Sequence, residues 1–408
     1  MSSRWLLRPS IALLGAITSS KSALLNPDKN PILNALLRWT VYNHFCSGTT
    51  PQEVRKSVDD LKRVGYQGVI LTHAKEIVLD EPHQPAATAD AGRTEHGSQC
   101  HSMVEKWKQS SLDTLRMLGA GDFLALKLTG AGPMAVEALR TQSAIPDAVD
   151  NALAQICSEA RRQGTRVWID GEQQALQRGI DEWVIGLMRR WNRDGAPGHE
   201  ALVYNTIQGY LKGAGANADR HIWLAAREGW TVGIKLVRGA YIEHEVRALI
   251  HDTKEETDAS YDAIAEKLVG QMLPPEAEAR GLRFPSAALF LATHNAASVA
   301  KISAMHRARL VAGLPTATLE YGQIVGMADE LGCELIVNYE RCLADPGMSK
   351  ARPPKAFKCL TWGSVGECMG FLHRRAIENR GAVERTKHMA GALREELWRR
   401  TWRMARRE

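Results

Sequence analysis

The chain has 408 residues, of which 44% are hydrophobic and 24% are charged, the proportions of an ordinary globular protein. A net charge of +6 is too small to indicate nucleic-acid binding by itself. Seven cysteines without CxxC spacing argue against a disulfide framework and against a zinc site. No apolar run is long enough to form a transmembrane helix. This length fits a single (βα)8 barrel with additional segments.

The N-terminal residues 1–25 are basic and rich in serine, and they lack acidic side chains. This composition fits a mitochondrial presequence and fits equally well an N-terminal arm packed on the domain. Residues 26–66 are expected to form an N-terminal helical segment, in which Thr50 and Pro51 open a helix that runs to Val64. We expect the catalytic barrel over residues 67–385 and a basic helical tail over residues 386–408.

Short apolar runs alternate along the chain with segments of helical periodicity, such as Glu182–Trp191. This alternation predicts an α/β fold, a (βα)8 barrel preceded by a helical arm. A doubly wound sheet would predict a GxGxxG turn after an early strand, and the chain has none. Residues 80–101 lack periodicity and are predicted to form a long loop. The expected strands are Gly68–Leu71, Phe123–Leu128, Arg166–Ile169, Ala201–Thr206, Val232–Leu236, Ala288–Ala292, Ala317–Leu319 and Glu334–Val337.

Polar side chains follow nearly every expected strand, at the end where barrel enzymes place their active sites. Lys235, Arg238 and Gly239 put two cations and a glycine at one strand-to-helix turn, which suits a phosphate or an electron-rich ring. Lys127 and Asp170 could form a structural ion pair at the barrel mouth, and His294 could be an ordinary core histidine. A metal-dependent lyase is an alternative on ligand type, although its ligands lack a spacing signature. Those candidate ligands are His73, His294, Asp170 and Glu172.

Near the C-terminus, Arg374 and Arg375 are followed by Glu378. On a helix, Arg374 and Glu378 share one face, and two guanidinium groups suit a small carboxylate because each can donate two parallel hydrogen bonds. The competing interpretation is a surface helix with an ordinary i,i+4 salt bridge.

Several motifs together resemble the proline dehydrogenase family, in the order in which that family carries them. Asn26–Pro31 and Leu360–Gly363 are similar to its fungal branch. The resemblance covers the chain from about Asn26 to about Asn379. The motifs are Asp170–Glu172, Lys235–Tyr241, Ala292–Asn295, Glu320–Gln323 and Arg374–Asn379.

The resemblance implies a distorted (βα)8 barrel that binds FAD and oxidises L-proline to 1-pyrroline-5-carboxylate by hydride transfer to flavin N5. It also implies a quinone electron acceptor and peripheral association with the mitochondrial inner membrane. Lys127, Asp170 and Lys235 would be catalytic, and Arg374 and Arg375 would bind the substrate carboxylate. Tyr241, Leu236 and Cys359 would line the substrate pocket. The implied cofactor residues are Gln208, Lys235, Arg238, Gly239, Ala240, Thr293, His294 and Glu378.

Cys359 departs from the family pattern, which usually has a tyrosine against the substrate ring at this position. One interpretation is that a neighbour such as Trp362 fills the gap and proline remains the substrate. The other is a roomier pocket that accepts 4-hydroxyproline or pipecolate. Ile242 also replaces a frequent aromatic residue. A non-catalytic paralogue is a third alternative, against which the retained lysines and arginines argue.

Overall fold

The computed structural model describes residues 4–20, 22–74, 93–193, 201–242, 245–345, 353–378 and 398. It divides the chain into two compact units, each of which is described by itself. The terminal unit consists of Met1–Asn43 and Ser364–Glu408, and the barrel unit consists of His44–Gly363.

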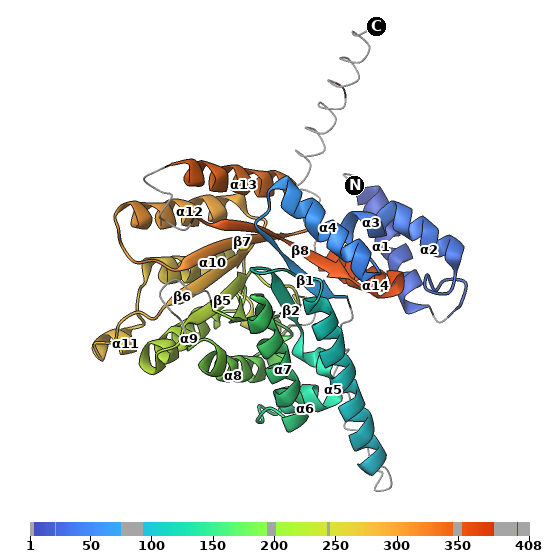
Figure 1. Cartoon of the computed structure of the whole chain (residues 1–408), viewed down its shortest axis with the longest axis horizontal. Coiled ribbons are helices and arrows are strands. Elements are labelled where there is room, and N and C mark those ends of the chain that lie inside the picture. The colour runs from blue at the N-terminus through green and yellow to red at the C-terminus, as the bar shows by residue number, and fades with distance from the viewer. Residues whose placement is uncertain are drawn as a thin grey trace. The chain divides into compact units, whose positions relative to one another are not determined.

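The barrel unit contains a closed barrel of parallel strands in which neighbours in sequence are neighbours in space (Figure 1). The last strand pairs with the first, with Gly68 opposite Phe357, and closes the cylinder. The predicted (βα)8 fold is therefore confirmed. The strands are β1 (Gly68–His73), β2 (Phe123–Leu126), β3 (Arg166–Ile169), β4 (Val203–Gln208), β5 (Val232–Val237), β6 (Ala287–Ala292), β7 (Thr318–Ile324) and β8 (Lys355–Trp362).

Helices connect the strands and surround the barrel (Figure 1). Local sequence sets their ends: in the helix over Lys254–Gly270, Thr253 and Glu256 form a reciprocal capping box. The short 3₁₀ turns are η2 (Leu128–Ala131) and η3 (Arg247–Leu249). The helices are α4 (Pro51–Val64), α5 (Arg93–Leu115), α6 (Pro133–Arg140), α7 (Asp147–Gln163), α8 (Gln174–Trp191), α9 (Ala214–Glu228), α10 (Lys254–Gly270), α11 (Pro275–Ala279), α12 (Ala296–Val311) and α13 (Asp329–Ala344).

Aromatic side chains fill the barrel interior. Phe123 stacks on Trp168 with ring centroids 5.3 Å apart, and it meets Phe290 and Phe357 edge to face. The Arg166 guanidinium lies 3.8 Å from the centre of the Phe123 ring and forms a buried ion pair with Glu320 at 2.7 Å. Arg166 is the first residue of β3, so this pair lies toward the N-terminal end of the barrel.

Two expectations from the sequence are wrong. The apolar run Glu334–Val337 is part of α13 and not the eighth strand, because Leu331, Leu335 and Ile336 are buried at helical spacing. The eighth strand is Lys355–Trp362. Part of the predicted loop 80–101 is also wrong, since α5 begins at Arg93. The remainder of that loop, residues 80–92, lies outside the described residues.

The terminal unit brings segments from both ends of the chain together. The Asp28 carboxylate accepts hydrogen bonds from the Ser364 hydroxyl and the Gly366 N–H, 2.8 and 3.0 Å away, at the start of α14. The tail expected over residues 386–408 lies outside the described residues except for Trp398. In the described part of the chain, no helix is both long and apolar enough to cross a membrane. The helical elements of this unit are α1 (Arg4–Ser19), α2 (Pro31–Leu37), the π-helical turn η1 (Arg38–Tyr42), α3 (Asn43–Phe45), which continues into the barrel unit, and α14 (Val365–Glu378).

The buried ion pair in the barrel interior generates a stability prediction. Arg166→Met should lower the free energy of unfolding by about 3–5 kcal/mol, because the Glu320 carboxylate stays buried without its compensating guanidinium. The double variant with Glu320→Leu should lose less than the sum of the two single variants. Chemical denaturation measures the free energy of unfolding of the single and double variants. Arg140→Met is the control, since its pair with Glu137 is exposed and should contribute little to stability. Equal losses for Arg166→Met and Arg140→Met would contradict the prediction.

Candidate active site

One carboxylate lies between two lysines at the C-terminal mouth of the barrel. Asp170 directly follows β3, and its Oδ1 lies 2.5 Å from Lys235 Nζ on β5. Its Oδ2 lies 3.6 Å from the Nζ of Lys127, which follows β2. Lys127 also donates a 3.2 Å hydrogen bond to the Tyr241 hydroxyl. The structure therefore brings Lys127, Asp170, Lys235 and Tyr241 together, as the sequence predicted, in a largely buried cluster with an excess of positive charge.

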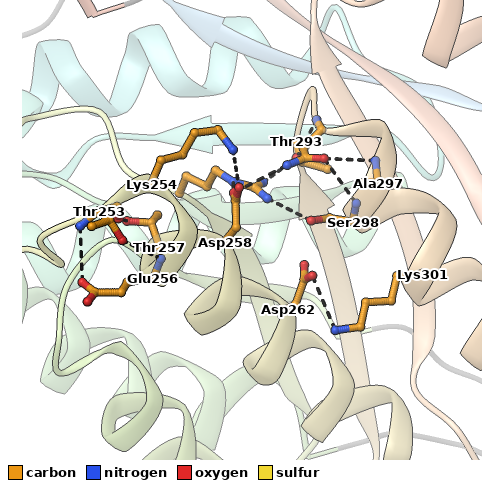
Figure 2. A network of polar contacts seen from close by, with 12 residues as sticks. Thr253, Lys254, Glu256, Thr257, Asp258, Asp262, Thr293, Ala297, Ser298 and Lys301 are labelled. Carbon is orange, nitrogen blue, oxygen red and sulfur yellow. Dashed lines mark hydrogen bonds and ion pairs between the residues drawn. The ribbon is translucent and has the colours of Figure 1, made fainter.

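A second group of polar contacts surrounds Arg238, the residue that follows β5. Its partners Asp258, Thr293 and Ser298 are labelled in Figure 2. The guanidinium donates to Asp258 Oδ1 at 2.6 Å, Thr293 Oγ1 at 2.8 Å and Ser298 Oγ at 2.9 Å. It also lies 4.2 Å from the centre of the Tyr261 ring. These contacts join the ends of β5 and β6 to the first turns of α10 and α12.

Asp258 holds Arg238 as an ionised carboxylate. Partial burial opposes ionisation, but hydrogen bonds from Lys254 and Arg238 outweigh it and lower the pKa of the Asp258 carboxyl below its ordinary 3.8. In Figure 2 the labelled Lys254, Thr293 and Ser298 converge on this network.

Gln208 and Glu172 link the ends of β3 and β4. The Gln208 side-chain amide donates to the Glu172 carbonyl oxygen at 2.9 Å. The Glu172 carboxylate accepts from the backbone N–H and the hydroxyl of Thr129, at 3.1 and 2.5 Å. Both side chains are buried, so Gln208 is held in one orientation.

Gly239 allows two backbone segments to come close together. Its φ of +137° lies in a region that disfavours other residues, and a Cβ there would lie 2.4 Å from the Tyr210 ring. Ala240 follows in the same loop, and Ile242 is exposed. The glycine at this predicted anion-binding turn is therefore required for packing.

The alternative metal site is not assembled. His73 packs edge to face on Trp362, and His294 Nε2 accepts a 3.2 Å hydrogen bond from the Ile324 N–H. In the part of the chain that the structure describes, no three His, Cys, Asp or Glu side chains form a group that could hold a metal ion.

Leu236 does not join this polar cluster, and its expected place in the substrate pocket stays a prediction. It neighbours the inward-facing Lys235 on a strand, so it points outward. It is fully buried in the apolar layer between the strands and the helices.

The Trp362 side chain does not fill the space beside Cys359 where the family usually has a tyrosine. Cys359 packs with Ala292 against the aromatic barrel interior. Trp362 is three residues further along β8 and packs instead on the outer layer that includes Val54, Val58 and Leu360. It also donates a hydrogen bond to the Thr114 hydroxyl at 3.1 Å.

Arg374 and Arg375 lie on α14 in the terminal unit. The Arg375 guanidinium lies 5.4 Å from the centre of the Phe371 ring, one helical turn earlier. Burial and the neighbouring Arg374 cation lower the pKa of His373. The Glu378 side chain lies outside the described residues, so the surface salt-bridge interpretation stays untested.

Sequence reasoning missed two residues of the site, Trp168 and Ser298. Trp168, whose ring lies 4.1 Å from Lys235 Nζ, stands two positions before Asp170 on β3, and strand alternation could have placed both on the inner face. Ser298 lies in the first turn of α12, and the sequence does not show which strand end that turn approaches. Asp258 belongs to the run Thr257–Tyr261 of α10, whose capping chemistry and possible cofactor contact the sequence did indicate.

A closed parallel barrel with a cationic, carboxylate-centred cluster at its C-terminal mouth defines a (βα)8-barrel enzyme. The family model described as proline dehydrogenase matches residues 54–388. The chain therefore belongs to the proline dehydrogenase family, oxidoreductases that act on CH–NH groups.

Named relatives cover most of the chain. The probable mitochondrial proline dehydrogenase of Schizosaccharomyces pombe is 26% identical, with 90% of this chain and 81% of the relative covered. The hydroxyproline dehydrogenase of Bos taurus is 27% identical, with 90% and 82% covered. Among solved structures, proline utilization A (PutA) from Bdellovibrio bacteriovorus, inactivated by N-propargylglycine, shares the fold with a TM-score of 0.60 at 15% identity. That match covers 92% of this chain and only 38% of the PutA chain.

The Asp258 network generates a pH prediction. The folded pKa of Asp258 is lowered, so its carboxylate contributes stability above the ordinary value of 3.8, and this stability is lost as the pH falls through the lowered value. Asp258→Asn should therefore destabilise the protein by about 1 kcal/mol at neutral pH. The difference from the wild type should shrink toward pH 2. Thermal unfolding across this pH range checks it, with Asp113→Asn at an exposed pair as the control. A difference that does not change with pH would contradict the assignment.

Proposed function

We propose that the protein oxidises L-proline to 1-pyrroline-5-carboxylate with FAD as its cofactor and a quinone as the electron acceptor. The observation that carries the proposal is Asp170, held between Lys127 and Lys235 at the barrel mouth beside Tyr241. Membership of the proline dehydrogenase family supports the same reaction.

The donor set at the ends of β4, β5 and β6 fits FAD. Arg238 is a cation beside the hydroxyls of Thr293 and Ser298. Gly239 has no side chain, so its backbone is not covered by one. Such a combination suits the phosphate-bearing part of a dinucleotide. Bound FAD supplies the two-electron acceptor for the hydride that leaves the substrate ring. The residues that would hold it are Gln208, Lys235, Arg238, Gly239, Ala240, Thr293, His294 and Glu378.

The lysines and the arginines have separate roles in the proposal. Arg374 and Arg375 bind the substrate carboxylate through paired N–H donors. The substrate amine must be neutral when the imine forms, because an ammonium has no lone pair. Lys127 and Lys235 favour this neutral amine by like-charge repulsion, and Asp170 keeps the two ammonium groups in place. Tyr241 lines the pocket.

The same chemistry on 4-hydroxyproline or pipecolate is the second candidate, and the surroundings of Cys359 favour it. Cys359 and Ala292 are small side chains against the barrel interior, and Trp362 packs on the opposite side of β8. Trp362 therefore does not replace the tyrosine that this family usually carries. The similarity to a relative named hydroxyproline dehydrogenase points the same way.

A mitochondrial location with peripheral attachment to the inner membrane completes the proposal. It is supported by the relative named as mitochondrial and by the basic, acid-free composition of residues 1–25. A quinone is a membrane-dissolved acceptor, which makes a position at the bilayer surface functionally consistent.

If Arg374 and Arg375 on α14 bind the substrate carboxylate, replacing either arginine should weaken substrate binding. Arg375→Met should raise KM for proline at least about tenfold, because a bidentate donor pair is lost. Steady-state oxidation of proline with an artificial electron acceptor measures it. Arg374→Lys should also raise KM, since lysine keeps the charge but loses the fork. Arg140→Met, at an exposed surface pair, is the control. An unchanged KM in Arg375→Met would remove Arg375 from the carboxylate site.

The pocket interpretation predicts a change in substrate preference. The wild type should accept 4-hydroxyproline, and Cys359→Tyr should lower kcat/KM for 4-hydroxyproline relative to proline about tenfold, because the tyrosine ring takes the space of the extra hydroxyl. Cys359→Ala is the matched control and should keep the wild-type preference. Measured kcat/KM values for proline, 4-hydroxyproline and pipecolate decide it. A wild type that strongly prefers proline over both would contradict the enlarged pocket.

A further inference from the structure

A stack of side chains runs along the barrel interior and ends beneath Lys235. Trp168 lies on β3 and contacts Phe123 in a stacked geometry, with centroids 5.3 Å apart, and Phe290 edge to face at 5.0 Å. On the far side of Phe123, Arg166 closes the stack. The Trp168 ring lies 4.1 Å from Lys235 Nζ. Because packed aromatic neighbours fix the indole, it presents a fixed surface to the ammonium group.

We infer that Trp168 is a positioning residue for the oxidation reaction: its indole face and the Asp170 carboxylate together hold the Lys235 ammonium at the barrel mouth. This inference rests on the proposed function of Lys235. Trp168 itself is 2% exposed and is assigned no contact with the substrate.

Lys235 shares its carboxylate partner with Lys127, so the Trp168 ring provides a second contact for the Lys235 ammonium. Asp170 is shared by two ammonium groups, at 2.5 Å from Lys235 and 3.6 Å from Lys127. An aromatic face attracts a cation electrostatically without adding a charge, and tryptophan does so most strongly. The indole therefore adds a second stabilising contact to the Lys235 ammonium without adding a negative charge.

No hydrogen bond to a described residue accounts for a tryptophan at this position. Its indole N–H is buried and has no hydrogen-bond partner among the described residues. A buried N–H of this kind normally finds a partner. The feature that the structure uses is accordingly the face of the ring, and Trp168→Phe keeps an aromatic face without breaking a hydrogen bond.

A double-mutant cycle between Trp168 and Lys235 tests the inference. Trp168→Leu should lower kcat for the amino acid about tenfold with KM within about threefold, whereas Trp168→Phe should stay within about threefold of the wild type. In a Lys235→Met background, Trp168→Leu should change kcat less than about twofold, since there is no ammonium left to hold. Released flavin is measured in each variant to correct for cofactor content.

Trp223→Leu is the matched control. Arg227 lies 4.2 Å from the centre of its ring on α9, and its indole N–H also has no described partner. It should leave kcat unchanged. An equal loss of kcat for Trp168→Leu with and without Lys235 would overturn the inference, and so would a Phe variant as impaired as the Leu variant.

A second readout does not depend on activity. In NMR spectra of protein with carbon-13-labelled lysine, the Lys235 side-chain signals, assigned by their loss in Lys235→Met, should be shifted upfield by the indole ring current. Trp168→Phe should keep an upfield shift and Trp168→Leu should abolish it. Unshifted signals in the wild type would overturn the inference. A wild type that oxidises no cyclic amino acid but shows the shift would refute the proposed function and leave the placement of Lys235 standing.

Discussion

The site depends on one ionic contact, the Asp170 carboxylate between the ammonium groups of Lys127 and Lys235. The three residues are far apart in sequence and come together because parallel barrel strands all end at the same rim. A carboxylate there allows two cations to lie near each other in a largely buried place, where like charges would otherwise repel strongly. Under the proposed function, the two ammonium groups favour a carboxylate-bearing substrate and disfavour its protonated amine.

The barrel interior connects stability at one end to chemistry at the other. Arg166 and Glu320 form a buried ion pair, and aromatic rings stack between this pair and the barrel mouth. At the upper end of the stack, the Trp168 ring contacts the Lys235 ammonium. The lower part of the stack contributes to stability, because a buried charge is costly unless it is paired, as Arg166 and Glu320 are. The upper part of the same stack lies against Lys235, the side chain to which the proposed reaction assigns a catalytic role. The fold thus positions the active site from inside as well as through its loops.

Much of this arrangement could be predicted from the sequence. Short apolar strands with polar ends predicted the barrel, and the strand ends contained Lys127, Asp170, Lys235 and Arg238. The misses have physical causes. A four-residue apolar run such as Glu334–Val337 does not distinguish a strand from a buried helical turn.

Side-chain direction was the other weakness. Leu236 was expected to line the pocket, and Trp362 was one candidate to fill the gap at Cys359. A period of two places each of them on the outer side of its strand. The same alternation places Trp168, two residues before Asp170, on the inner face with it, so the sequence could have indicated Trp168 as well. The contacts of Asp258 and Ser298 with Arg238 depend on how two helices approach the barrel, which no local pattern specifies.

Anaerobic mixing of the purified protein with proline, 4-hydroxyproline and pipecolate tests the central claim most directly. The account predicts a yellow protein whose oxidised-flavin absorbance is lost on adding proline or 4-hydroxyproline, without any external acceptor. A protein that is colourless after incubation with FAD, or whose bound flavin keeps its absorbance with all three amino acids, would contradict it.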